Sequence, residues 1–320
     1  MFAKKRVYAD AAAATPLSGR AKAELGRLLA LCGNPGALHR EGLAAKKALE
    51  QARTLVGKTV GAHPDEIVFV GSGTEANNLA ITGVLRPLLR SVRTSDVRLH
   101  AVTCVIEHPS VLEPLRALAR GLPVGRHGLE LTELEVDQSG LVDPEALRRA
   151  IKENTVFVSI QLVNSEVGTI EPIKEIAKII RQIRTTPARA LRAARPSLTL
   201  ALSSSDLPLP IYFHTDASQA PLWMPLAVEA LGVDLLTLDA QKVLGPKGVG
   251  ALYIKRGTPV EPLLRGGGQE RGLRGGTENV PLAGAFAVAL QDAQSGVETR
   301  AEKISAGGKS FCRRTRELVE

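Results

Sequence analysis

The sequence predicts an α/β fold, with a mostly parallel sheet flanked by helices. Two observations support this class. Short β-branched runs alternate with amphipathic helical segments from residue 67 to residue 254, and such alternation is typical of strand–helix–strand units. The runs are also almost continuously apolar, as expected for parallel strands that are buried on both faces.

The elements follow from local patterns. Pro109 stands at the first position of one expected helix, and the Asp143–Pro144 pair opens another. The expected strands are the apolar runs at residues 67–70, 99–105, 156–163, 211–214, 235–238 and 249–254. The expected helices are at residues 75–85, 109–119, 143–152 and 173–183, with a long last helix from Pro281 to about Val319.

Two segments interrupt this alternation. Residues 184–210 contain four prolines and the tract Ser203–Ser205, which indicates an inserted surface loop of unusual length. Residues 265–279 are rich in glycine, as in Gly266-Gly267-Gly268.

Composition excludes several classes of protein. The chain has 320 residues, a formal net charge of +8 and 44% hydrophobic residues, so it is too apolar to be disordered. No run is long enough for a transmembrane helix, and the basic start leads into no signal-peptide core. Cys32, Cys104 and Cys312 lie too far apart for a disulfide framework or a metal site. We therefore expect no metal and a reducing, cytoplasmic location.

Much of the excess positive charge lies in two arginine clusters. One spans residues 181–195 and the other residues 313–316. A surface that binds nucleic acid would place aromatic side chains among such charges, and none is nearby. We interpret the first cluster as a solvated basic loop and expect no direct contact with nucleic acid.

Three patterns carry chemistry. The segment Gly71–Asn78 follows a strand and opens a helix, so its free amides and the Thr74 hydroxyl fit either a phosphate or an ordinary tight turn. Asp216 ends a strand, where it would pair with a pyridinium nitrogen or cap the next turn. Lys242 follows a strand and precedes Gly245-Pro246, where it would form a Schiff base or remain a surface lysine. Together they match the phosphate, ring nitrogen and aldehyde of pyridoxal phosphate.

The chain resembles the cysteine desulfurases, in the class V aminotransferase group of fold-type I pyridoxal-phosphate enzymes. The resemblance runs from Tyr8 to the end of the chain, outside residues 184–210. The segments that carry it are Tyr8-Ala9-Asp10 with Thr15-Pro16, Asn34–His39, Gly71–Asn78, Glu107-His108, Asn164–Gly168, Asp216–Gln219, Lys242 with Gly245–Gly248, and Gly266–Asn279.

The resemblance implies a role for each matching residue. Lys242 would hold the cofactor and move the substrate's Cα proton, and His108 would stack on the ring and take part in proton transfer. Asp216 would hold the ring nitrogen. The other cofactor contacts would come from Gly73, Thr74 and Gln241 at the phosphate, Gln219 and Asn164 at the phenolic oxygen, and Thr277 at the phosphate of the other subunit of a homodimer. Asn34 and Asn164 would line the substrate side.

The resemblance also implies three parts of the chain. Residues 1–15 would pack on the small domain, residues 16–258 would form the large cofactor-binding domain, and residues 259–320 would begin an incomplete small domain.

Two departures from the family pattern stand out. Asp239 and Gln241 occupy positions where the family usually has a serine or threonine and a histidine. Gln241 can still donate to phosphate, whereas an ionised Asp239 would repel it. In addition, the family's nucleophilic cysteine lies beyond Glu320, and none of the three cysteines matches it.

We therefore expect a cysteine desulfurase that is truncated at its C-terminus. The full enzyme would convert L-cysteine to L-alanine and pass sulfur, as a persulfide, to an iron–sulfur scaffold or a tRNA-thiolation protein. This chain alone would then be inactive. Two alternatives stay open: a selenocysteine lyase or small-amino-acid transaminase of the same fold, and a non-catalytic dimerising or scaffold protein.

Overall fold

The computed structural model describes residues 8, 10–92, 98–121, 128–185, 210–300 and 302–304. Most of the expected insertion at residues 184–210 lies outside these ranges, as do Cys312 and the end of the last expected helix. The expected division of the chain into three parts stays a prediction.

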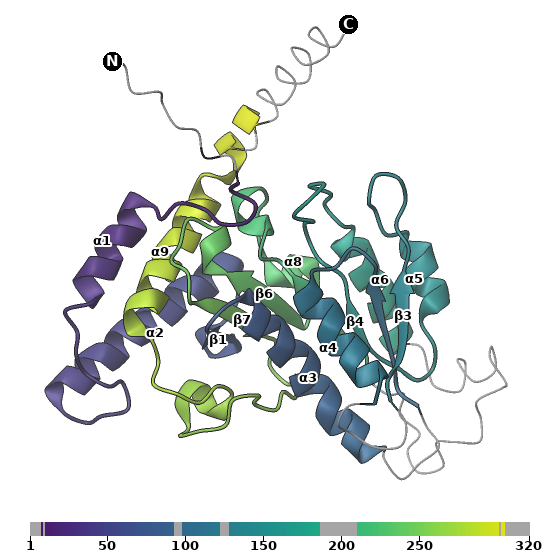
Figure 1. Cartoon of the computed structure of the whole chain (residues 1–320), viewed down its shortest axis with the longest axis horizontal. Helices are drawn as coiled ribbons and strands as arrows, with labels where there is room; N and C mark the ends of the chain where they lie inside the picture. Colours follow the sequence, from purple (N-terminus) through teal and green to yellow (C-terminus); the bar gives the residue numbers. More distant parts are fainter. Residues whose placement is uncertain are drawn as a thin grey trace, which may run out of the picture.

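A mixed sheet lies at the centre of the described fold, between helices (Figure 1). Its strands are β1 (Ile67–Val70), β2 (His100–Cys104), β3 (Glu130–Leu134), β4 (Thr155–Ser159), β5 (Tyr212–Asp216), β6 (Leu235–Asp239) and β7 (Gly250–Ile254). The α-helices are α1 (Gly19–Leu28), α2 (Arg40–Val60), α3 (Gly73–Ser91), α4 (Pro109–Ala119), α5 (Pro144–Ala150), α6 (Ile173–Thr185), α8 (Val228–Leu231) and α9 (Val280–Ser295). The short 3₁₀ turns are η1 (Pro64–Glu66), η3 (Ala220–Leu222), η4 (Ala240–Lys242) and η5 (Gln269–Gly272).

The sheet order is β1-β7-β6-β5-β4-β2-β3. Strand β7 pairs antiparallel with both β1 and β6, and every other pairing is parallel. All strands except β7 therefore point the same way, and their carboxyl ends meet at one edge of the sheet. The prediction of a mostly parallel α/β sheet is confirmed.

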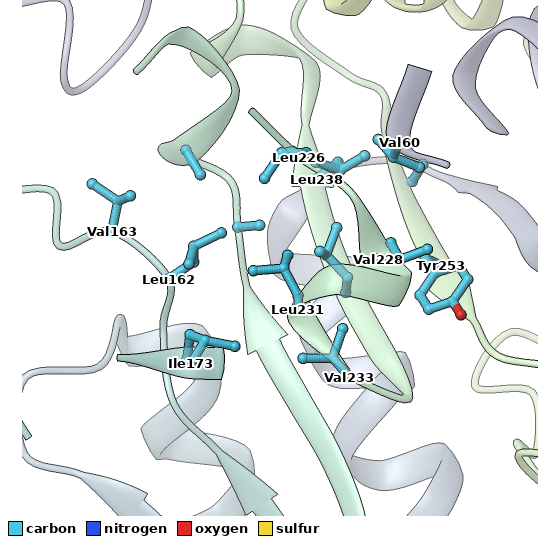
Figure 2. Close-up of a cluster of buried hydrophobic side chains, with 14 of the residues drawn as sticks. Val60, Leu162, Val163, Ile173, Leu226, Val228, Leu231, Val233, Leu238 and Tyr253 are labelled. Carbon is cyan, nitrogen blue, oxygen red and sulfur yellow. The ribbon is translucent and has the colours of Figure 1, made fainter. Parts of the chain in front are cut away.

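Two apolar clusters cover the two faces of the sheet. Helices α3 and α4 pack on one face, around residues such as Val68 and Ala101. Helices α2, α6, α8 and α9 contribute to the larger cluster on the other face. Figure 2 shows part of this larger cluster, with the labelled residues Val60, Leu162, Val163, Ile173, Leu226, Val228, Leu231, Val233, Leu238 and Tyr253. The alternation of side chains along β1 feeds both clusters, so burial on both faces explains its wholly apolar sequence.

Some expected elements have different bounds. The run at 156–163 forms a strand only as far as Ser159, although Ile160, Leu162 and Val163 are also buried. The run is apolar because it is buried, and only its first part pairs as a strand. The helix expected after Pro281 is interrupted rather than continuous: α9 ends at Ser295, Gly296 follows as its cap, and residues 297–300 and 302–304 are helical again. Glycine is a poor helix former.

Candidate active site

A polar pocket lies at the edge of the sheet where the parallel strands end. It is lined by Gly73, Thr74, Asn77, His108, Ser110, Gln161, Val163, Ser165, Asp216, Ser218, Gln219, Asp239, Gln241 and Lys242. These residues follow or end β1, β2, β4, β5 and β6. Ligands of open α/β sheets bind outside the carboxyl ends of the strands, so the topology itself explains why these distant segments meet.

The start of helix α3 forms one wall of the pocket. Ser72 caps the helix by accepting a hydrogen bond from the amide of Glu75, and the Glu75 carboxylate accepts one from the amide of Gly71. This arrangement turns the chain sharply from β1 into α3, so Gly73 and Thr74 face the pocket in the first helical turn. The free amides of such a turn favour an anion.

Asp216 lines the pocket at the end of β5. Its Oδ2 atom accepts a hydrogen bond from Nδ2 of Asn77 at 2.7 Å, and its Oδ1 atom accepts one from the amide of Ser218 at 2.9 Å. The same Asn77 nitrogen donates to Oγ of Ser110 at 2.8 Å. Both carboxylate oxygens of Asp216 are thus held in place by hydrogen-bond donors.

A buried row of polar groups lies next to Asp216. Ser159 Oγ is 3.3 Å from Oε1 of Glu107 and 2.9 Å from Nδ1 of His214, and Nε2 of His214 is 3.1 Å from Oγ1 of Thr237. Burial, together with the charge of Asp216, raises the pKa of Glu107 well above its usual range. Burial lowers the pKa of His214 to about 4. At neutral pH the imidazole of His214 is therefore uncharged.

His108 follows β2 and caps helix α4. Its Nδ1 atom accepts a hydrogen bond from the amide of Ser110 at 3.1 Å, and Pro109 occupies the first helical position. The cap fixes the orientation of the ring, which lines the pocket.

Lys242 lies in η4, beyond the end of β6. Its Nζ atom donates to the backbone oxygens of Ala12 at 2.8 Å and Ala13 at 2.7 Å, and Nε2 of Gln219 donates to the oxygen of Ala12 at 2.9 Å. Residues 10–15, which we call the N-terminal strap, therefore lie against the lysine. Thr15 anchors the strap, since its hydroxyl donates to the oxygen of Gln241 and accepts from the amide of Leu244, each at 2.7 Å.

The structure brings most of the predicted site residues together. Lys242, His108, Asp216, Gln219, Gln241, Gly73 and Thr74 all line the pocket. Asn34, Asn164 and Thr277 do not. Asn34 accepts a hydrogen bond from the amide of Gly36, and Asn164 accepts from the amides of Glu166 and Val167, so both side chains stabilise turns. Thr277 is exposed. The roles that the resemblance implies for these residues stay predictions.

Sequence reasoning missed several pocket residues, above all Asn77, Ser110 and Ser218. A signal existed for two of them. Asn77 lies one helical turn after Thr74, on the same face of α3, and Ser218 follows Asp216 by two residues at the same strand end. Ser110 emerges only from the fold, because it meets Asn77 from another helix.

The residues of the pocket fit the ring of pyridoxal phosphate. A carboxylate fixed by two donors, an imidazole and a lysine amine face one cavity. In addition, Oδ1 of the buried Asn77 has no hydrogen-bond partner within the described ranges, which leaves an acceptor free for a donor group of a ligand. At the phosphate end, the Thr74 hydroxyl and the first turn of α3 line the pocket together with the carboxylate of Asp239.

The two cysteines in the described part of the chain do not line the pocket. Cys104 is buried at the end of β2, and burial raises the pKa of its thiol far above the usual range. A thiol in such surroundings is inert. Cys32 is exposed, beyond the end of α1.

None of the described helices combines the length and apolar character needed to cross a bilayer.

Comparisons with known proteins identify the family of the chain. The family model described as aminotransferase class-V matches residues 7–186 and 210–308. A curated relative, the cysteine desulfurase IscS of Dictyoglomus turgidum, is 41% identical over 278 residues, which cover 87% of this chain and 61% of the relative. The chain therefore spans less than two thirds of the length of this relative.

Solved structures show the same likeness. A NifS-like protein superposes with a TM-score of 0.83 at 31% identity and covers 98% of this chain and 76% of its own. A structure of SspA in complex with cysteine has a TM-score of 0.74 at 33% identity, covering 88% of this chain and 71% of its own. The chain belongs to the class V aminotransferase family of pyridoxal-phosphate-dependent enzymes, and its curated relatives there are cysteine desulfurases.

Proposed function

We propose that this chain carries the pyridoxal-phosphate site of a cysteine desulfurase, with Lys242 as the residue that bonds the cofactor. One observation supports this most strongly: the amine of Lys242, the carboxylate of Asp216 and the first turn of α3 line the same pocket. These three groups match the aldehyde, the ring nitrogen and the phosphate. The related protein SspA was solved in complex with cysteine, which points to the same class of substrate.

The bound cofactor supplies an electron sink that stabilises negative charge at the Cα atom of an amino acid joined to it. The chain's own residues prepare this chemistry. Asp216, held by Asn77 and the amide of Ser218, would hold a protonated ring nitrogen. His108 would stack on the ring and share in proton transfer, and Lys242 would move the Cα proton.

Other residues position the cofactor and the substrate. Gln219 would reach the phenolic oxygen, while Gly73, Thr74 and Gln241, which line the same pocket, would lie at the phosphate. Asn34 and Asn164 would line the substrate side; in the structure the side-chain oxygens of both accept hydrogen bonds from backbone amides.

Release of sulfur from L-cysteine needs a thiolate acceptor. The C–S bond breaks, the sulfur joins the thiolate as a persulfide, and a proton completes L-alanine. Neither Cys32 nor Cys104 lines the pocket, so we propose that the acceptor thiol comes from outside the described residues. We expect no persulfide on Cys104, because its thiol is buried and protonated.

We further propose a homodimer, a reducing and cytoplasmic setting, and a protein acceptor of sulfur such as an iron–sulfur scaffold or a tRNA-thiolation protein. The exposure of Thr277, which lies outside this chain's own pocket, supports a role at the site of a second subunit. Sedimentation of the loaded protein would test the dimer.

The central test is covalent trapping. The protein is incubated with pyridoxal phosphate, reduced with borohydride and digested, and the modified peptide is identified by mass spectrometry. We expect the label on Lys242 and none in a Lys242→Ala variant. As a control, Lys247→Ala removes a nearby lysine that does not line the pocket and should label as the wild type does. Folded protein without label on Lys242 would refute the proposal and favour a scaffold role.

A second measurement addresses the reaction itself. The loaded protein is mixed with L-cysteine with and without an added thiol, and alanine is quantified. We expect alanine formation to depend on the added thiol. Alanine formed at the same rate without it, with a persulfide on Cys32 or Cys104, would contradict the proposed source of the acceptor.

A further inference from the structure

The carboxylate of Asp239 lies at the end of the pocket where a phosphate would bind. Asp239 ends β6, and its carboxylate accepts a hydrogen bond from the amide of Gly73, in the first turn of α3. A Cβ atom at Gly73 would be 3.1 Å from Oδ2 of Asp239 and 3.1 Å from Oγ of Ser218. The side chain therefore stands directly against the amides that attract an anion.

We call the amides at the start of α3 and the side chain of Gln241 the phosphate cradle. Asp239 also accepts hydrogen bonds from Gln241, the second part of this cradle. Its Oδ1 atom accepts from the amide of Gln241, and its Oδ2 atom accepts from the side-chain Nε2 of Gln241, each at 3.2 Å. The donor that Gln241 would offer to a phosphate is thus bonded to a carboxylate of the same chain. The hydroxyls of Thr74 and Ser218 remain beside the cradle.

The charges around this position do not offset a phosphate next to Asp239. Among the residues that line the pocket, Lys242 is the one lysine or arginine, and the second carboxylate is that of Asp216. Burial raises the pKa of Asp239, while the hydrogen bonds from Gln241 and Gly73 favour its charged form.

We propose that Asp239 is a specificity-determining residue of the cofactor pocket: its carboxylate occupies the donors of the phosphate cradle, so this chain binds the phosphorylated cofactor weakly and discriminates little between pyridoxal phosphate and unphosphorylated pyridoxal. This inference rests on the proposed bonding of the cofactor to Lys242. The weak binding that it predicts concerns the phosphate end of the pocket and not the ring end.

Calorimetric titration of the cofactor-free full chain tests the inference. Pyridoxal phosphate and pyridoxal are each titrated into the wild type, Asp239→Ser and Asp239→Asn. We expect the wild type to bind the two ligands with dissociation constants within about threefold of each other. Both variants should bind pyridoxal phosphate about tenfold more tightly or better, because the amides and Gln241 are released to the phosphate. Their affinity for pyridoxal should stay within about twofold of the wild type.

A matched control distinguishes the loss of a negative charge anywhere in the chain from its loss at the phosphate end of the pocket. Asp143 caps helix α5 by accepting from the amides of Glu145 and Ala146, and it does not line the pocket. Asp143→Asn removes one negative charge from a cap, as Asp239→Asn does, and should leave both affinities unchanged. Thermal unfolding of every variant shows that the proteins compared are folded.

The outcomes are distinct. The inference is supported if both Asp239 variants, but not Asp143→Asn, bind pyridoxal phosphate more tightly than the wild type while their affinity for pyridoxal is unchanged. Unchanged or weaker binding of pyridoxal phosphate by the variants overturns it, even if borohydride still labels Lys242 and the proposed function stands. If neither ligand labels Lys242 in any of the folded proteins, the proposed function fails and the inference fails with it.

Discussion

Arg53 and Glu270, which are 217 positions apart in the sequence, form a buried two-point ion pair with both N–O distances at 2.7 Å. Their side chains are 3% and 1% exposed. Arg53 also donates to the oxygen of Ile67, and Glu270 accepts from the amide of Phe69. The pair therefore ties the glycine-rich segment, in which Glu270 and Arg271 both have positive φ, to helix α2 and strand β1.

Removal of one partner should destabilise the fold strongly. In Arg53→Met the carboxylate of Glu270 stays buried without its cation, so we expect the free energy of unfolding to fall by about 3–5 kcal/mol. The double variant Arg53→Met with Glu270→Gln should recover part of this loss, since the remaining buried group is uncharged. Urea unfolding measures all three. Asp65→Asn breaks an exposed ion pair with Arg256 and should change little; an equally small effect of Arg53→Met would contradict the argument.

His108 should show two separable roles. His108→Ala removes the cap of α4 and should lower the free energy of unfolding by about 1 kcal/mol. His108→Asn keeps an acceptor for the amide of Ser110 and should stay within about 0.5 kcal/mol of the wild type. Both variants lose the ring and should bind the cofactor more weakly. Equal destabilisation of the two would disprove the capping role, and unchanged cofactor affinity in His108→Asn would disprove the stacking role.

The apolar patterns of the sequence identified the central strands but not the edges of the fold. Strand β3 was missed because it lies at one edge and is half-buried, with glutamates at two of its five positions. Helices α1 and α2 were also missed, although α2 packs closely against α9. The reversed direction of β7 was predictable in hindsight. The connection from Asp239 to Gly250 is too short for a crossover between parallel strands.

Within the site, residues at strand ends were easier to predict than residues in turns. Asp216 and Lys242 stand where parallel strands end, so the topology directs them to the same edge. Asn34 and Asn164 lie in turns, where a short amide side chain bonds to nearby backbone. The sequence shows which residue types are present there. Whether such a side chain bonds to its own turn or points into the pocket depends on the backbone conformation of the folded chain.

The N-terminal strap should slow access to Lys242. The hydroxyl of Thr15 makes two of the hydrogen bonds that hold the strap, and Thr15→Val removes both. With a net contribution of about 1 kcal/mol per bond, the loss of both amounts to about 2 kcal/mol, so we expect labelling of Lys242 by pyridoxal and borohydride to become about thirtyfold faster. Thr59→Val is the matched control, because the Thr59 hydroxyl bonds only to the oxygen of Leu55 in its own helix. A rate that is the same in both variants would show that the strap does not limit access.

His100 should make the stability of the fold sensitive to mild acid. Its ring is fully buried between two hydroxyls, with Nδ1 2.7 Å from Oγ1 of Thr155 and Nε2 2.8 Å from Oγ1 of Thr132. Burial, followed by the positive charge of Lys152, lowers the pKa of His100 from 6.5 to about 4.

Below pH 6.5 the unfolded chain takes up a proton at this residue while the folded chain does not, so stability falls as the pH drops from 6.5 towards 4. With these two values, His100 accounts for about 2 kcal/mol of the stability lost between pH 7.5 and pH 5. His100→Gln keeps polar contacts with both threonines but does not titrate, so its stability should fall by about that much less over the same range. Urea unfolding at the two pH values measures the difference. Because all other histidines are the same in the two proteins, an equal loss of stability in the two would rule out a lowered pKa at His100.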